Sequence, residues 1–235
     1  MSFVAVLLNL MLREIDTGIW VTEAPQKFLG AEIGTRMTVI RLADGSLFVH
    51  SPVHLDDEVR ATLDRIGPVR HVVAPNRYHH LYAADYSQSY REAKLYAAPG
   101  LETKRSDLHF DAILSDEAPE VWRGQIDQLV FWGFPPLNET VFLHRPSRTV
   151  LFTDLLFNLT HTDSAWTRVV MTLDGGFGRP AVARTFRLLM RMRKQTVMDS
   201  VARILKWDFD RMTLTHGEVV ECGAKMALQD AYSFL

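Results

Sequence analysis

The chain has 235 residues, of which 47% are hydrophobic and 23% charged, a composition typical of a globular protein with enough length for one large core. Its 26 basic and 28 acidic residues leave a net charge of -2. This charge is too small for the chain as a whole to attract nucleic acid or acidic lipid, so we expect neither partner. The lone Cys222 excludes an internal disulfide and a cysteine zinc cage. We expect a single cytoplasmic domain over residues 1–235.

The first segment, "MSFVAVLLNLML" (1–12), is an apolar run that resembles the core of a signal peptide. It has no basic residue before the run and no clear small-residue cleavage site, and it is too short to span a bilayer. We therefore expect a terminal strand or helix packed on the core. Anchoring on a membrane surface is the alternative interpretation.

The first half is rich in short β-type runs, and Asp44-Gly45 between two of them is a strong hairpin signal because both residues tolerate positive φ. A helix is predicted next, since Val59, Leu63 and Ile66 have helical spacing and Gly67-Pro68 is a common helix ending. The strands are expected at 18–22, 36–42 and 46–51, and the helix at 55–67.

A strand–helix–strand unit follows, with a buried strand at 69–74, a helix over about 79–91 and a strand at 94–98. Such units usually pair parallel strands through a right-handed crossover. Ligands in these sheets bind beyond the carboxyl ends of the strands. Residues 75–80 occupy such an end, which makes them a candidate site.

The second half repeats this pattern, which predicts two sheets enclosed between helical layers, an αββα sandwich in the α/β class. Strands are expected at 127–133, 139–144, 149–157 and 211–215, a long helical region from about Pro180 to Lys206, and a final helix to Leu235. The segment 172–180, "TLDGGFGRP", reads as a loop.

Polar side chains of metal-binding types follow three of the buried strands: His79-His80 after "VVA", Asp154 after "TVLFT" and His216 after "RMTLT". If the strands are neighbours, these side chains converge, and imidazoles with a carboxylate suit zinc or iron. A surface or hydrogen-bonded role is the alternative for each histidine. Adjacent histidines also diverge inside a regular helix. They converge only if the backbone is still turning there, which Pro75 favours.

The order of these motifs resembles the metallo-β-lactamase superfamily, and more narrowly an uncharacterised group within it known only as a domain of unknown function. The resemblance covers nearly the whole chain beyond about residue 12 and implies the αββα sandwich with a metal centre at one edge. It is carried by "GIWVT", "TVIRLADGSLFVHSP", "VVAPNRYHHL", "KLYAAPG", "VLFTDLLF" and "LTHGE".

The superfamily hallmark His-x-His-x-Asp-His is only half present. Aligning its last histidine with His80 puts His79 at the aspartate, Arg77 at the second histidine and Pro75 at the first. Leu137 stands near the place of a further histidine. The resemblance places Asp154 at the metal-bridging aspartate and His216-Gly217 at the final motif.

All three histidines of the first metal position are therefore lost, while the second position keeps ligand-competent side chains. We predict a mononuclear site in which His79, His80, Asp154 and His216 hold one divalent ion, zinc or iron. Arg77 could hold an anionic group through its planar fork of donors, or could form an ordinary surface ion pair. Arg77 and Asp154 are the predicted catalytic residues.

Three functions are compatible with this pattern. The first is a metal-dependent hydrolase with an unknown small-molecule substrate. The second is a catalytically inactive relative that kept the fold and acts as a binding or scaffolding protein. The third is a membrane-peripheral protein using the N-terminal run and a basic helical stripe, for which a solvated helix face is the simpler explanation. That stripe consists of Arg184, Arg187, Arg191 and Lys194.

Overall fold

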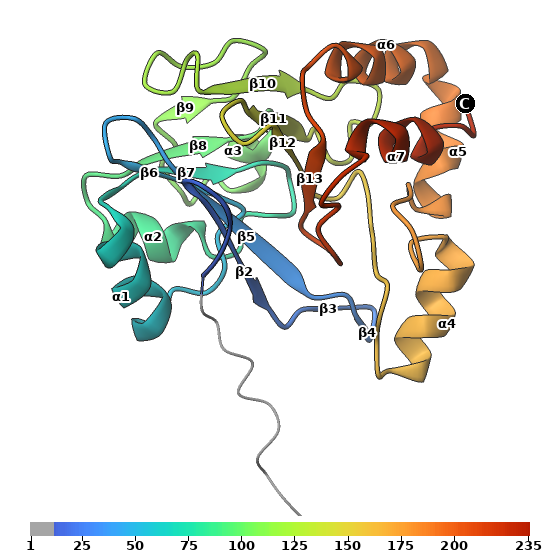
Figure 1. Ribbon diagram of the computed structural model, residues 1–235, viewed down its shortest axis with the longest axis horizontal. Coiled ribbons are helices and arrows are strands. Elements are labelled where there is room, and N and C mark those ends of the chain that lie inside the picture. Colours follow the sequence, from blue (N-terminus) through green and yellow to red (C-terminus); the bar gives the residue numbers. More distant parts are fainter. Residues whose placement is uncertain (1–11) are drawn as a thin grey trace, which may run out of the picture.

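Two β-sheets lie face to face, and helices cover both outer faces (Figure 1). The computed structural model describes residues 12–235. The N-terminal strand or helix expected over residues 1–12 lies almost entirely outside them. The four layers confirm the predicted αββα sandwich.

The first sheet is mixed, with strand order β1-β2-β5-β6-β7-β8-β9. Its pairs are antiparallel from β1 to β6 and parallel from β6 to β9. The strands are β1 Arg13–Asp16, β2 Ile19–Ala24, β5 Thr35–Arg41, β6 Leu47–His50, β7 Val69–Ala74, β8 Lys94–Ala97 and β9 Ala112–Ile113.

The second sheet has the order β10-β11-β12-β13, and a separate two-stranded hairpin pairs β3 with β4. In the second sheet only β12 and β13 are parallel. The strands are β10 Ile126–Val130, β11 Thr140–His144, β12 Thr149–Phe152, β13 Arg211–Leu214, β3 Lys27–Phe28 and β4 Ala31–Glu32.

Seven helices occur in the described part of the chain. Helices α1 and α2 pack on the first sheet, and α5, α6 and α7 pack on the second. The helices are α1 Asp57–Ile66, α2 Ala83–Ser89, α3 Leu101–Lys104, α4 Ala165–Asp174, α5 Arg184–Met192, α6 Lys194–Leu205 and α7 Ala224–Ala231. No helix among residues 12–235 has the length and apolar character needed to cross a membrane.

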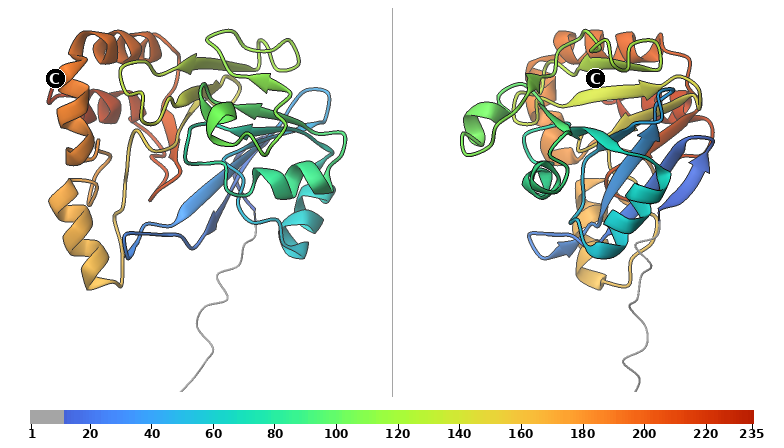
Figure 2. Two further views of the ribbon diagram at one scale, coloured as in Figure 1. Left: turned by 180° about the vertical axis from the view of Figure 1, so that it is seen from behind. Right: turned by 90° about the vertical axis from the view of Figure 1, so that its left-hand side faces the viewer.

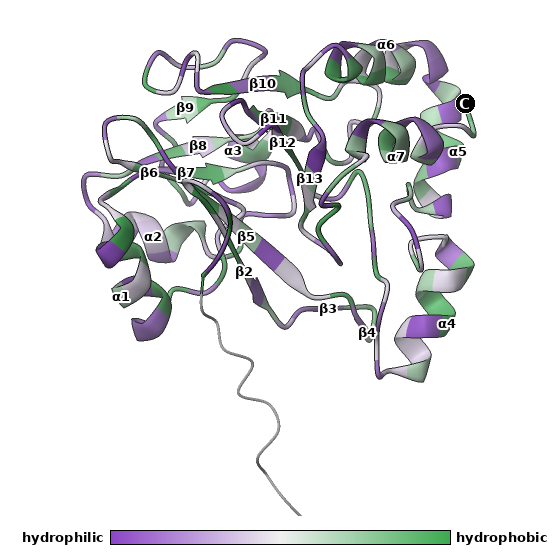
Figure 3. Ribbon diagram, viewed as in Figure 1, coloured by the Kyte–Doolittle hydropathy of each residue, from purple (hydrophilic) through white to green (hydrophobic). Residues whose placement is uncertain are grey.

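Alternation of side chains along the strands builds the layers. Val72 of β7 packs outward against α1 and α2, whereas the next residue, Val73, packs inward between the sheets. On β11, Val141 faces the helices that cover the second sheet, and Phe142 faces the first sheet. Because successive side chains of a strand point to opposite faces, continuous apolar strands supply two cores at once, and Figure 3 shows these strands as mostly hydrophobic.

Two predicted helices differ from the structure. The helix expected over 79–91 begins only at Ala83, because residues 76–82 form turns in which the side chain of Asn76 accepts backbone N–H groups. The long helix expected from Pro180 to Lys206 is two helices, which meet at Arg193 with φ -124° and ψ 32°. Lys194 is therefore not on one helical stripe with Arg184, Arg187 and Arg191.

Helix α4 was not predicted, and it shapes the region around the site. The hydroxyl of Ser164 accepts from Thr167 N and caps the start of the helix. The helix continues to Asp174, so residues 172–174 of the loop predicted over 172–180 are helical. The β3–β4 hairpin lies against α4, as both views in Figure 2 show. The backbone N–H of Glu32 donates to Thr167 Oγ1 over 2.7 Å and joins the two.

Candidate metal centre

Three side chains of types that could hold a metal ion, here called the metal-ligating group, come from three strand ends and meet at one edge of the sandwich. His79 follows β7 of the first sheet, whereas Asp154 and His216 lie just beyond the parallel strands β12 and β13 of the second. Their ligand atoms all lie within 4.8 Å of one another. The group therefore joins the two sheets at the carboxyl ends of their strands, where α/β folds bind ligands.

The distances within this group are short. Nε2 of His216 lies 2.9 Å from Oδ1 of Asp154, and Nε2 of His79 lies 3.3 Å from the same oxygen. The two imidazole Nε2 atoms are 3.2 Å apart. All three residues are largely shielded from solvent. These three atoms thus point at one small volume.

The hydrogen bond made by Nδ1 of an imidazole determines whether its Nε2 has a lone pair free for a metal ion. Nδ1 of His216 lies 2.6 Å from the carbonyl oxygen of Gly34, which can only accept, so Nδ1 carries the proton. Nε2 of His216 lies against Oδ1 of Asp154 and can meet it in two ways. In a charged ring Nε2 donates to the carboxylate, whereas in a neutral ring its lone pair faces the same oxygen, and only a cation between the two atoms removes their repulsion. The arrangement therefore fits a metal ion, which would take the place of the Nε2 proton, with the tautomer of His216 set in advance.

Further contacts hold the two rings in place. Oγ of Ser51, at the end of β6, lies 2.9 Å from Nδ1 of His79. The ring of Phe157 stacks on that of His216 with centroids 5.3 Å apart. Gly217 must follow His216, because a Cβ there would lie 2.1 Å from the carbonyl oxygen of Asn158.

The second oxygen of Asp154 is occupied by protein. The amide of Asn76 donates to Oδ2 over 2.8 Å, and it also lies 3.2 Å from Glu139 Oε2. Glu139 is fully buried, and its carboxylate accepts from the backbone N–H groups of Thr153, Asp154 and Leu155. Asn76 and Glu139 together fix the loop that carries Asp154.

The neighbouring carboxyl groups of Asp154 and Glu139 have pKa values shifted in opposite directions. Burial alone would raise the pKa of Asp154, but the charge of His79 and the hydrogen bond to His216 outweigh it and hold that pKa well below its ordinary value. Burial, together with the negative charge of Asp154, raises the pKa of Glu139 to about 8. Asp154 is thus kept ionised, which is the state that binding a metal ion would require.

His80 does not join the group. Its Nδ1 lies 2.9 Å from Nη1 of Arg105, and burial with the charges of Lys104 and Arg105 lowers its pKa to about 4. The two adjacent imidazoles diverge although the backbone is not yet helical there. The structure therefore brings together three of the four predicted ligands and places the fourth elsewhere.

Arg77, predicted to hold an anionic group, lies away from the three ligands. Its Nη1 is 3.5 Å from the carbonyl oxygen of Pro135, its stem runs beside Gly100, and it does not line the cavity next to the metal-ligating group. The backbone around it is structural, because Arg77 N donates to Leu137 O and Thr140 N donates to Pro75 O. Pro75, Arg77 and Leu137, which the resemblance aligns with histidines of the superfamily, thus tie the loop after β7 to the start of β11.

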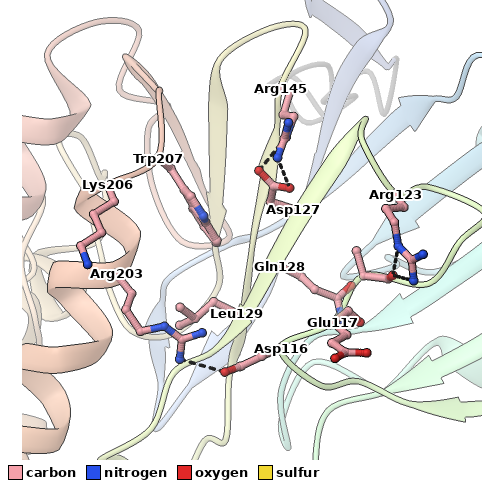
Figure 4. Close-up of a pocket in the computed structure, with 11 residues that line it drawn as sticks. Asp116, Glu117, Arg123, Asp127, Gln128, Leu129, Arg145, Arg203, Lys206 and Trp207 are labelled. Atoms are coloured by element: carbon pink, nitrogen blue, oxygen red, sulfur yellow. Dashed lines mark hydrogen bonds and ion pairs between the residues drawn. The ribbon is translucent and has the colours of Figure 1, made fainter.

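A cavity of about 570 Å³ opens beside the metal-ligating group and is lined by all three of its members. A larger one, about 790 Å³, lies near β10 and α6. Figure 4 shows two ion pairs among the residues that line it, Arg145 with Asp127 and Arg203 with Asp116. The described residues of this second cavity contain no such group of metal ligands, so we place the site at the first.

Three features of the site were not predicted from the sequence: Ser51, Glu139, and the hydrogen bond from the amide of Asn76 to Asp154. Ser51 carried a usable signal, because it too is a polar residue directly after a buried strand. Glu139 stands alone as an acidic residue before the apolar run "TVFLH", which is a weaker signal. The contact of Asn76 with Asp154 has none, since its 78-residue separation appears only in the folded chain.

Solved structures of the metallo-β-lactamase fold resemble this chain along almost its whole length. The metallo-beta-lactamase from Pontibacter korlensis aligns with a TM-score of 0.63 and 11% identity, over 96% of this chain and 99% of that one. The mono-zinc form of the metallo-beta-lactamase FIM-1 from Pseudomonas aeruginosa gives 0.63 and 11%, over 95% of both chains. The Flv1 flavodiiron core from Synechocystis gives 0.64 and 11%, over 95% of this chain and 60% of that one.

The fold and the group at its edge therefore define a protein of the metallo-β-lactamase fold. Residues 16–172 match the family described as "Domain of unknown function (DUF4336)". Because the match spans most of the chain, the protein belongs to this family. A search of curated proteins found no match.

Proposed function

We propose that this protein binds one divalent metal ion, zinc or iron, through His79, Asp154 and His216 and acts as a metal-dependent hydrolase. The observation that carries the proposal is the convergence of two Nε2 atoms and one carboxylate oxygen within 3.3 Å, while the opposite side of His216 is hydrogen-bonded to Gly34 O. Two imidazoles and a carboxylate suit both metals.

The absence of His80 from the ligand group favours catalysis over a structural role. Structural zinc sites are closed by four protein ligands, whereas catalytic sites use three and keep a position open. A bound ion would polarise a carbonyl or phosphoryl oxygen or lower the pKa of water. The chain itself orients the imidazoles through Ser51 and Gly34 and places an apolar cavity wall beside them.

Asn76 supports a single metal. The amide of Asn76 donates to Oδ2 of Asp154, the oxygen that turns away from His79 and His216. With this oxygen engaged, and with Pro75, Arg77 and Leu137 at the positions of the lost histidines, the described residues supply no second set of ligands. A mononuclear centre is the form that these contacts favour.

The substrate proposed for this site is a small molecule, and the compartment proposed is the cytoplasm. The net charge of -2 gives no support to nucleic acid. The exposed free thiol of Cys222 suits a reducing compartment.

The competing function is an inactive binding protein of the same fold. The loss of the three histidines, whose positions now serve the loop after β7, favours it. Metal analysis of the purified chain after reconstitution with zinc or ferrous iron separates the two. The proposal predicts one equivalent of metal in the wild type and less than a tenth of this in Asp154→Asn and His216→Ala. If the wild type contains no more metal than the two variants, the result would support the inactive binding protein.

A further inference from the structure

The cavity beside the metal-ligating group is polar at one place and apolar elsewhere. The three ligands line one part of it. Its walls come from the β3–β4 hairpin, α4, α5 and the loop after β10, and they are largely apolar. The large apolar side chains that line it include Phe28, Leu29, Phe134, Phe157, Leu173 and Phe186. Its volume, about 570 Å³, is within the range of small-molecule sites.

The other charged groups on this cavity are engaged with helix ends. The carboxylate of Asp174 accepts from the backbone N–H and hydroxyl of Thr185, and Arg184 Nη1 donates to the carbonyl oxygen of Leu173. Both lie where α4 ends and α5 begins. Away from the three ligands, a bound molecule is therefore recognised mainly by apolar contact.

The outer end of the cavity is apolar and open. Phe28, Leu29 and Leu173 line it and are 59%, 81% and 68% exposed. Large side chains of this kind next to a cavity mark a binding groove more often than chance exposure does. A chain-like apolar group can thus enter from solvent here and reach the metal-ligating residues.

We propose that the substrate is an amphiphile, with a linear aliphatic chain that occupies this cavity and an oxygen-bearing carbonyl or phosphoryl head at His79, Asp154 and His216. This inference rests on the proposed function for the position of the head. The chain is placed by the cavity walls alone. Polar substrates such as sugars or nucleotides would leave their hydroxyl and phosphate groups against Phe134, Phe157 and Phe186 without partners.

Calorimetric titration with acetate, hexanoate and decanoate tests the inference, using the full chain in zinc-loaded and metal-free forms. The carboxylate stands in for the head and the alkyl tail for the substrate chain. Affinity for the zinc-loaded protein is expected to rise about fourfold for each added methylene that the cavity buries. Equal affinities for acetate and decanoate would overturn the inference and leave the metal function standing.

A matched pair of exposed leucines supplies the control. Leu173 lines the cavity and Leu188, on α5, does not, yet each is 68% exposed. Leu173→Gln is expected to weaken decanoate binding about fivefold or more without changing acetate binding, whereas Leu188→Gln leaves both unchanged. Equal weakening by the two variants would place the alkyl chain elsewhere and overturn the inference.

The metal-free form separates the two proposals. One outcome is that affinity rises with the length of the alkyl chain in both forms while zinc changes the affinity for none of the three carboxylates. This result would support the apolar site and contradict the metal function. Sedimentation of the protein alone addresses a different occupant. If the chain self-associates and decanoate dissociates it, a second copy covers the cavity, which would overturn the inference.

Discussion

At the scale of single residues, His79 and His80 are neighbours with different partners. His79 contacts Ser51, Asp154 and His216, whereas His80 contacts Arg105. Turn residues 76–82 set these directions, and Asn76 holds the first of them through two backbone N–H groups. The side chain of His79 therefore faces the candidate metal centre, and that of His80 is buried beside Arg105.

Replacing each of these histidines in turn tests that division. His79→Gln is expected to weaken zinc binding at least a hundredfold, since it removes one of three ligands, and His80→Gln less than threefold. A competition titration with a fluorescent zinc chelator measures both. Equal losses in the two variants would restore the four-ligand centre expected from the sequence.

Glu139 is predicted to be a stabilising residue of the site rather than a ligand. Glu139→Ala leaves the backbone N–H groups of Thr153, Asp154 and Leu155 without their buried acceptor, which is expected to cost about 3 kcal/mol or more. Glu139→Gln keeps one acceptor oxygen and is expected to cost less. Urea unfolding in the presence of a chelator measures both, and a Glu139→Ala loss below about 1 kcal/mol would contradict this role.

At the scale of elements, the quality of the end signals explains which helices the sequence predicts well. Helix α1 has an acidic N-cap, Asp56, that accepts from Val59 N, and it stops at Gly67. Helix α2 has no side-chain cap at its start, so its first residue depends on how the preceding turns pack. The α5–α6 break at Arg193 lacks a proline or glycine to announce it.

The candidate site was predictable as far as strand ends determine it. His79, Asp154 and His216 each follow a buried strand, and parallel neighbours such as β12 and β13 bring their carboxyl ends together. The direction of His80 and of Arg77 could not be predicted, because it depends on contacts with Arg105 and Pro135. Both partners are at least 25 residues away in the chain.

The β11–β12 hairpin carries a pH-sensitive residue remote from the site. His144 is buried against Ser147, and burial lowers its pKa to about 4. Above pH 6.5 it is neutral in both folded and unfolded chains. As the pH falls from 6.5 towards 4, only the unfolded chain takes up the proton, so the folded state loses stability, at most about 1.4 kcal/mol per pH unit.

His144→Gln isolates this effect, because all other titrating groups are shared with the wild type. The difference in unfolding free energy between the wild type and the variant is expected to shift against the wild type by up to about 2 kcal/mol between pH 7 and pH 5. Denaturant unfolding at the two pH values, with chelator present, measures it. A difference that stays constant would show that His144 titrates normally in the folded chain.

At the scale of the whole molecule, the candidate metal centre lies where the two sheets meet. His79 comes from the first sheet and Asp154 and His216 from the second. The core between the sheets, built from residues such as Phe48, Trp122 and Phe142, holds these strand ends in register. An ion bound there would cross-link the sheets.

Metal binding is therefore expected to stabilise the entire fold. A ligand that binds only the folded chain, at a free concentration one hundred times its dissociation constant, adds about 2.7 kcal/mol to the unfolding free energy. Zinc should raise the melting temperature of the wild type in a scanning calorimeter and leave Asp154→Asn unchanged. A similar rise in both would indicate binding outside the three ligands.

A crystal structure of the zinc-soaked protein, with anomalous diffraction data collected on both sides of the zinc edge, tests the three-ligand centre most directly. We predict one anomalous peak, about 2.0–2.2 Å from Nε2 of His79, Nε2 of His216 and Oδ1 of Asp154, with His80 still beside Arg105. A map with no peak among these atoms, or with His80 as a ligand, would contradict a centre of these three residues.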